Sequence, residues 1–220
     1  MKLKTFIKKA KVRIKSNPKV FVIGFNKTGT TTLKRVLWEL GYSIGDQGEG
    51  ELLLKSWGTD FNNKLIDYCK TAEAFQDLPF SMPEVYKKLY DEFGDSKFIL
   101  TTRDNSEQWF NSLCNFHSKI WNENDGVPNA VKLKQANYRY TGFAYDSFKI
   151  LFETDDKDLY NKSALIAKYE SHNADVRSFF KAKLDSFIEI NVSEQKDYHR
   201  LCNFLSTPPQ RQGFLWENKT

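Results

Sequence analysis

The segment of residues 19–40 constrains the fold of this chain more than any other feature of the sequence. Residues 19–23 form a short apolar and β-branched run, which is typical of a strand buried on both faces of a parallel sheet. A loop between Gly24 and Gly29 follows, and residues 30–40 then place leucine and valine at helical spacing. The order of strand, glycine-flanked loop and helix predicts the first unit of an α/β sheet.

The same alternation recurs along the rest of the chain. Further strands are predicted at residues 72–76, 97–102 and 186–190, and helices at residues 83–93, 106–121 and 198–205, with a mostly helical, aromatic-rich stretch at residues 128–174. This alternation predicts an α/β three-layer sandwich, in which a central, mostly parallel sheet is flanked by helices on both faces. Because ligands bind at the carboxyl ends of the strands in such sheets, the residues that follow each strand are the candidates for a site.

Positive charge is concentrated at the N-terminus. The chain has a net charge of +5, but its first fifteen residues carry seven lysines and arginines and no acid, which leaves a net charge of −2 for the rest. The body therefore lacks the basic surface of a nucleic-acid-binding protein, and we expect no nucleic acid as a partner. We predict two units, a basic N-terminal segment at residues 1–16 and one domain at residues 17–220.

Apolar residues recur at helical spacing within the basic segment. The favoured interpretation is a helix that packs its apolar face on the domain, and the alternative is a weak contact of residues 1–15 with an anionic membrane surface. A cleavable signal peptide is not expected, because lysines interrupt the segment. The odd number of cysteines (Cys69, Cys114 and Cys202) predicts a reducing, cytoplasmic location without a disulfide framework, and the scattered histidines predict no metal site.

The loop after the first strand has the composition of an anion-binding site. Backbone N–H groups at a helix N-terminus favour a phosphate there, Lys27 adds a positive charge, and neighbouring threonines add hydroxyl donors. A triphosphatase P-loop has lysine directly after its second glycine, whereas Thr30 stands there in this chain, so the sequence indicates a different anion. The alternative is a glycine turn with Lys27 in solvent. The candidate phosphate-binding residues are Asn26, Lys27, Thr28, Gly29, Thr30 and Thr31.

Polar residues follow two other strands. Arg103 comes after the second strong strand, with Ser112 in the next helix, and an arginine fork suits a second phosphate. The alternatives are a local salt bridge with Asp104, or a helix N-cap formed by Asp104 or Ser106. Asp77 follows the weaker strand and fits a general base, with an Asx turn as the alternative. Together the three strand ends suit a nucleotide with two separated phosphates and a nucleophile that needs deprotonation.

These motifs resemble those of the sulfotransferase family. Residues 24–31 are similar to the family's 5′-phosphosulfate-binding loop, residues 97–104 with Ser112 to its 3′-phosphate-binding element, and residues 77–80 to the segment that supplies the catalytic base. The resemblance covers residues 19–205, and its C-terminal part is similar to the bacterial-type branch. It implies a fold like that of the P-loop nucleoside triphosphate hydrolases.

The resemblance also implies a role for each motif. The donor would be 3′-phosphoadenosine 5′-phosphosulfate (PAPS), the product 3′-phosphoadenosine 5′-phosphate (PAP), and no metal would take part. Lys27 would stabilise charge on the leaving phosphate, while the loop holds the 5′-phosphate. Arg103 and Ser112 would hold the 3′-phosphate, as would Arg211 in a basic-glycine element near the C-terminus. Asp77 would take the proton of an acceptor hydroxyl or amine as it attacks sulfur in line.

The chain departs from the family pattern at three positions. Asn105 stands where proline is usual, and Asn111 rather than Ser112 lies eight residues after Arg103. Asp77 stands where better-known branches have histidine or glutamate. An unperturbed aspartate has a pKa of about 3.9, so Asp77 is a weak base unless burial raises its pKa.

Two other functions fit some of these features. The first is a kinase-like P-loop phosphotransferase, and the second is a catalytically inactive nucleotide-binding module. The acceptor is expected to be a small molecule or a carbohydrate, with a carbohydrate preferred over a phenol, a lipid or a protein tyrosine. It would be recognised within the aromatic-rich residues 116–152, and the alternative, favoured for most of these aromatics, is that they form the core of a helical subdomain.

Overall fold

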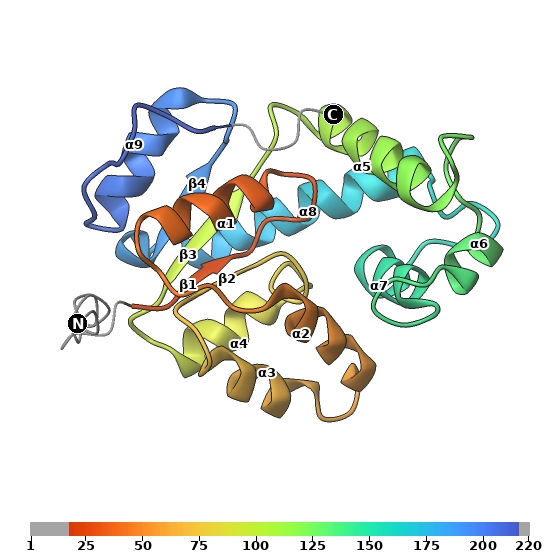
Figure 1. The fold of residues 1–220 in the computed structure, drawn as a ribbon, viewed down its shortest axis with the longest axis horizontal. Coiled ribbons are helices and arrows are strands. Elements are labelled where there is room, and N and C mark those ends of the chain that lie inside the picture. The colour runs from red at the N-terminus through yellow and green to blue at the C-terminus, as the bar shows by residue number, and fades with distance from the viewer. Residues whose placement is uncertain (1–17, 216–220) are drawn as a thin grey trace, which may run out of the picture.

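The computed structural model describes residues 18–215, and in this range a parallel sheet is covered by helices on both faces (Figure 1). The strands are β1 (Val20–Val22), β2 (Ala74–Gln76), β3 (Lys97–Thr101) and β4 (Phe187–Ile190). The helices are α1 (Thr30–Glu39), α2 (Gln47–Leu52), α3 (Phe61–Cys69), α4 (Val85–Glu92), α5 (Ser106–Trp121), α6 (Ala130–Gln135), α7 (Phe143–Phe152), α8 (Lys162–Phe180) and α9 (Gln195–Phe204). The predicted basic segment, residues 1–16, lies outside the described residues.

The strands run parallel in the order β2-β1-β3-β4. Phe21 of β1 pairs with Phe75 of β2 on one side and with Phe98 of β3 on the other. All of β1 is buried, as its unbroken apolar run predicts for an inner strand of a parallel sheet. The described strands thus confirm the α/β class, with every neighbouring pair parallel.

Alternate residues of the strands pack into two separate cores, one on each face of the sheet. The sheet and the helices on its two faces therefore form three layers. Val20 and Val22 of β1 pack under α1 and α9 on one face of the sheet. Phe21 points to the opposite face, where it packs with residues of α3, α4 and α8 in a larger, aromatic core. Phe98 lies between Phe21 and Phe180 of α8 in that core, with ring centroids 5.4 and 4.9 Å away. The alternation of a strand's side chains therefore divides this apolar sequence between two helical layers.

The aromatic-rich stretch predicted as mostly helical contains α6, α7 and most of α8. Figure 1 shows α5, α6 and α7 beyond the edge of the sheet, with α8 running back beneath the strands. Trp109 of α5 stacks on Tyr169 of α8 with ring centroids 4.5 Å apart, which joins this group of helices to the layer beneath the sheet. The group faces the carboxyl ends of the strands and leaves a cavity there.

Two features of the fold differ from the sequence analysis. The helices α2 and α3 were not predicted, and the glycines at positions 48 and 50 weaken the helical pattern of α2. The N-cap of α5 is neither Asp104 nor Ser106 but Asn105, whose side chain accepts a hydrogen bond from the Gln108 N–H at 2.8 Å. Asp104 instead accepts hydrogen bonds from Asn191 and Ser193. The capping role gives Asn105 a structural reason to stand where the family usually has proline.

Candidate active site

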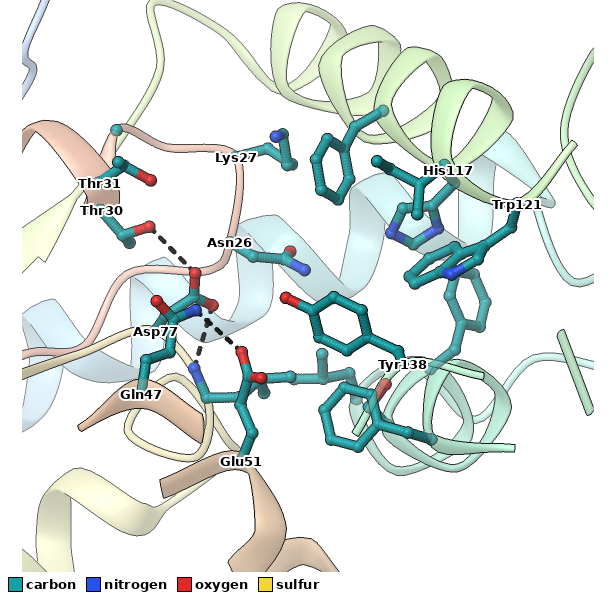
Figure 2. Close-up of a pocket in the computed structure, with 18 of the residues that line it drawn as sticks. Asn26, Lys27, Thr30, Thr31, Gln47, Glu51, Asp77, His117, Trp121 and Tyr138 are labelled. Carbon is teal, nitrogen blue, oxygen red and sulfur yellow. Dashed lines mark hydrogen bonds between the residues drawn. The ribbon is translucent and has the colours of Figure 1, made fainter. Parts of the chain in front are cut away.

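A cavity of about 360 Å³ lies at the carboxyl ends of β1, β2 and β3 (Figure 2). Each of the three strand ends named by the sequence analysis contributes to it, through Lys27, Asp77 and Arg103. One end of the cavity is polar and the other apolar. Its lining residues are Asn26, Lys27, Gly29, Thr30, Thr31, Thr32, Gln47, Glu51, Asp77, Leu78, Arg103, Phe116, His117, Ile120, Trp121, Tyr138, Phe143, Ser147, Phe148, Leu151 and Phe152.

Buried hydrogen bonds fix the path of the loop between β1 and α1. The Thr28 hydroxyl lies 2.5 Å from the Phe25 carbonyl and 2.6 Å from the Thr101 hydroxyl, and Trp109 donates to the Asn26 carbonyl at 3.1 Å. The Thr28 side chain is therefore held in the protein interior, and only the backbone of this predicted site residue can face a ligand.

The loop then turns directly into the N-terminus of α1. Gly29 has a φ of 99°, and a Cβ at this position would lie 2.5 Å from a methyl group of Val192, so a larger residue does not fit. Within residues 18–215 no side chain caps α1, and its first turn carries no acid. The first N–H groups of α1 thus present a positive end of the helix dipole beside Lys27.

Lys27 reaches the polar end of the cavity from a strained backbone position, with a φ of 68°. Its ammonium lies 3.5 Å from the ring centroid of Phe116 on α5, a close cation–π contact. Burial lowers the pKa of Lys27 to about 8, against the opposing effect of the Asp77 carboxylate. At neutral pH most of the lysine is still charged, with a poorly solvated ammonium that gains from pairing with an anion.

Asp77 lies across the polar end from Lys27, directly after β2. Its carboxylate accepts hydrogen bonds from the Thr30 hydroxyl at 3.2 Å and from the Leu78 N–H at 3.0 Å. Burial raises the pKa of Asp77, although both hydrogen bonds and Lys27 oppose the rise. The structure thus shows the condition under which an aspartate becomes a stronger base. The bond to Leu78 is not the Asx turn given as the alternative, because an Asx turn needs the N–H two residues on and Pro79 has none there.

Arg103 connects the loop to α5. Its Nε donates to the Lys27 carbonyl at 2.6 Å, and its Nη2 lies 3.5 Å from the Ser112 hydroxyl. Arg103 and Ser112 also line a second hollow of about 440 Å³ beside the cavity, together with Asn105, Glu107, Gln108, Asn111 and Asn115. Ser112 is buried and touches Arg103, whereas Asn111 is exposed at the rim. Of these two predicted alternatives, Ser112 is the one that the arginine reaches.

Arg211 does not join the other predicted site residues. It forms an ion pair with Glu39, the last residue of α1, at the opposite end of that helix from the loop. Arg211 lines neither the cavity nor the hollow beside it. The tail that carries it packs through Phe214 against Tyr198 of α9, with ring centroids 5.5 Å apart.

The apolar end of the cavity is built by α5 and α7. Phe116, Ile120 and Trp121 line it from α5, and Phe143, Phe148, Leu151 and Phe152 line it from α7. The His117 ring lies among them with its Nδ1 2.7 Å from the Tyr160 hydroxyl. Burial, with a smaller effect of Lys27, lowers the pKa of His117 to about 3, so this imidazole is neutral at physiological pH.

Glu51, Gln47 and Tyr138 were not identified from the sequence as site residues. Glu51 and Gln47 belong to α2, which lacks a clear helical pattern, and Tyr138 was grouped only with the other aromatic residues. No motif marks these residues, because α2 and the segment after α6 meet only in the folded chain. A glycine between two acids, Glu49-Gly50-Glu51, is the local signal available.

The fold and the site together define an α/β protein with a cavity at the carboxyl ends of its parallel strands. A family model described as Sulfotransferase domain matches residues 19–220, and the chain belongs to this family. It is therefore an enzyme of sulfuryl transfer, as its motifs predicted. No curated protein matches the chain.

No helix within residues 18–215 is long and apolar enough to cross a membrane. In the same range, no three side chains of histidine, cysteine, aspartate or glutamate gather closely enough to hold a metal ion.

Proposed function

We propose that the protein transfers the sulfuryl group of PAPS to a hydroxyl or amine of a small acceptor. The observation that carries this proposal is the convergence of Lys27, Asp77 and Arg103 on one sheet edge, from three different strand ends. A cation, a partly buried carboxylate and a guanidinium are the groups that such a reaction needs around a doubly phosphorylated donor.

The residues present fit the donor. PAPS carries anionic groups at two separated positions, and the structure offers two separated cationic places. The uncapped N-terminus of α1 with Lys27, Thr30 and Thr31 suits the 5′-phosphosulfate. The hollow lined by Arg103 and Ser112 suits the 3′-phosphate. When bound, the donor supplies an activated sulfuryl group.

Lys27 and Asp77 have complementary tasks in this proposal. Asp77 accepts the proton of the acceptor as the new bond to sulfur forms, and burial supports this by raising the pKa of its carboxyl. Lys27 holds the negative charge that develops on the leaving phosphate oxygen as the old bond to sulfur breaks. Its low solvation, which lowers the pKa to about 8, makes that interaction stronger than it would be in water.

The walls of the cavity favour an acceptor with an apolar body. Seven apolar side chains of α5 and α7 line the apolar end, and one of them, Phe116, also contacts the Lys27 ammonium. A carbohydrate, the acceptor preferred from the sequence, needs several hydrogen-bonding partners, and this end supplies few. We propose an aromatic or other apolar alcohol of modest size, presented with its hydroxyl toward Asp77.

A thermal-shift titration with PAP, beside ATP with magnesium, tests the donor. A ligand at one hundred times its dissociation constant stabilises a protein by about 2.7 kcal/mol, which raises the unfolding midpoint of a domain of this size by several degrees. We expect a shift with PAP and none with ATP and magnesium. A shift only with ATP and magnesium would favour the kinase-like alternative, and no shift with either would favour a module that has lost its nucleotide site.

Turnover of labelled PAPS with two acceptor classes then tests the acceptor. We expect transfer to 2-naphthol, an aryl alcohol, and none to a simple monosaccharide. Transfer confined to sugars would restore the carbohydrate as the acceptor.

A further inference from the structure

A second carboxylate lies in the cavity and has no task in the chemistry proposed above. Glu51 of α2 lines the cavity, and its side chain is only 5% exposed. It accepts hydrogen bonds from Gln47 at 2.9 Å and from Arg139. Gln47 in turn accepts one from Gln76, the last residue of β2, at 3.0 Å. A buried acid is costly unless it is paired, so its position calls for an explanation.

Arg139, the partner of Glu51, lies in the segment between α6 and α7. The two residues are 88 positions apart, so their ion pair joins α2 to the helices beyond the sheet edge. The Arg139 guanidinium also lies 4.6 Å from the ring centroid of Tyr138. The Arg139 guanidinium thus contacts both the Glu51 carboxylate and the ring of Tyr138, its neighbour in the chain.

The segment that carries these two residues is a short turn with a defined shape. Asn137 and Thr141 form an isolated antiparallel bridge, and the Gly142 N–H donates to the Ala136 carbonyl at 3.0 Å. Gly142 has a φ of 92°, which closes the turn before α7. The turn has no regular helix or strand of its own, so side-chain contacts decide how it lies against the cavity.

Tyr138 is the part of this turn that faces the cavity. Its ring lies beside Phe143 and Trp121, with centroids 5.6 and 6.4 Å away. Figure 2 shows its hydroxyl pointing inward between Asn26 and Glu51, toward the side on which Asp77 lies. Burial, with the carboxylates of Glu51 and Asp77, raises the pKa of Tyr138, so the hydroxyl keeps its proton and can donate a hydrogen bond.

We propose that Tyr138 contacts the acceptor, and that the Glu51–Arg139 ion pair positions Tyr138 against it. The Tyr138 ring closes the apolar end over the body of an aryl alcohol, and its hydroxyl donates to the acceptor oxygen. Glu51 and Arg139 act through Tyr138 and do not touch the reacting atoms. The inference rests on the proposed function, because it assumes that the apolar end of the cavity receives the acceptor.

Two arginines allow a matched test. Arg139 pairs with buried Glu51, and Arg200 pairs with buried Asp197, whose side chain is 6% exposed, on α9 at the other face of the sheet. Arg139→Gln and Arg200→Gln each leave a buried carboxylate without its guanidinium, so both destabilise the fold by the same mechanism. Only Arg139→Gln releases Tyr138.

The measurement is calorimetric binding of 2-naphthol to the full chain saturated with PAP. We expect Arg139→Gln and Tyr138→Ala each to weaken 2-naphthol binding about tenfold, and Tyr138→Phe to weaken it by a smaller factor. The double variant Tyr138→Ala, Arg139→Gln should bind 2-naphthol no more weakly than Tyr138→Ala alone, because the two residues act as one unit. Arg200→Gln should stay within twofold of the wild type, and the affinity for PAP should be unchanged in every variant.

Equal 2-naphthol affinities for Arg139→Gln and the wild type would overturn the positioning role, and an unchanged Tyr138→Ala would overturn the contact. If the wild type binds PAP but not 2-naphthol, the proposed acceptor contact is wrong and the proposed donor site is retained. If it does not bind PAP, the proposed function itself fails.

Discussion

The two ends of the cavity are built in different ways. The donor end is mostly backbone, made by the loop after β1 and the first turn of α1, and it is fixed by buried hydrogen bonds such as those of Thr28 and Arg103. The acceptor end is mostly side chain, made by aromatic residues of α5 and α7 and by the turn with Tyr138. The donor end has three residues with positive φ, Lys27, Gly29 and Asp77, whereas the acceptor end has positive φ at Gly142, in the turn before α7, and not inside its helices.

The difference follows from what each end has to do. Binding a phosphosulfate needs N–H groups and charges at fixed positions, and a short loop tied to a central strand provides them. Binding an apolar acceptor needs a shape, which packed side chains provide and which substitutions can alter without disturbing the sheet. We therefore expect substitutions at the donor end to affect turnover and PAP binding, and those at the acceptor end to affect the acceptor alone.

The largest effect is expected at Asp77, where the two ends meet. Asp77→Asn keeps the size of the side chain and removes the base, so kcat should fall by about 10²- to 10⁴-fold while PAP affinity stays within twofold. The wild-type rate should fall as the pH drops through the raised pKa of Asp77, since the protonated acid cannot accept a proton. Steady-state kinetics with 2-naphthol as a function of pH measures both the loss of kcat and the pH dependence. The exposed Asp67→Asn variant is the control and should keep the wild-type kinetics. Undiminished turnover would show that Asp77 is not the base.

The second effect belongs to the donor end. Arg103→Gln should weaken PAP binding by about 2 kcal/mol, or roughly 30-fold, because a guanidinium bond to a phosphate is lost. Ser112→Ala should cost about 1 kcal/mol and Asn111→Ala less, because Ser112 is the residue that Arg103 reaches. Calorimetric titration of PAP measures all three. A larger loss for Asn111→Ala than for Ser112→Ala would place the 3′-phosphate contact at the rim of the hollow.

A comparable effect is expected at the acceptor end, on a different quantity. Trp121→Ala removes an aromatic wall of the cavity, so the KM for 2-naphthol should rise about tenfold. PAP affinity should remain that of the wild type, and the same titration provides that control. If PAP binding fell as well, the two ends would not be separable in the way their construction suggests.

The pH dependence of donor binding gives a further effect, of up to about tenfold. Lys27 has a pKa of about 8, so it is mostly charged at pH 7 and mostly neutral at pH 9. PAP affinity should therefore fall as the pH rises through this range, because the neutral amine does not pair with a phosphate. Lys27→Met should bind PAP weakly and with little change between pH 7 and pH 9. Exposed Lys88→Met should keep the wild-type profile.

The smallest effect is expected at Arg211. Because it pairs with Glu39 at the far end of α1, Arg211→Ala should change PAP affinity by less than twofold. The same calorimetric titration measures it. A tenfold loss would show that the C-terminal tail reaches the 3′-phosphate when the donor binds, as the sequence motif predicted.

Much of the donor end could be predicted from the sequence. The predicted helix 106–121 coincides with α5, and the run at residues 19–23 contains β1. The loop, Asp77 and Arg103 follow strands directly, and parallel strands bring their carboxyl ends to one edge. The order of strands and loops along the chain was therefore enough to predict that these residues meet.

The acceptor end depends on tertiary structure. Glu51 and Arg139 meet across 88 positions, and no spacing in the sequence relates them. The burial that lowers the pKa of Lys27 and raises that of Asp77 also comes from packed neighbours and not from adjacent residues. Likewise, only the packing shows that the Thr28 side chain faces the interior and that Arg211 lies beside Glu39.

The sequence by itself thus determined the α/β class, the family and the strand ends that carry Lys27, Asp77 and Arg103. These depend on hydrophobic periodicity and on short motifs, which are local properties of a chain. The tertiary structure decided which side chains close the acceptor end and how the charges in the cavity are tuned. Such features arise from contacts between residues far apart in the sequence, whose energies exist only once the chain has packed.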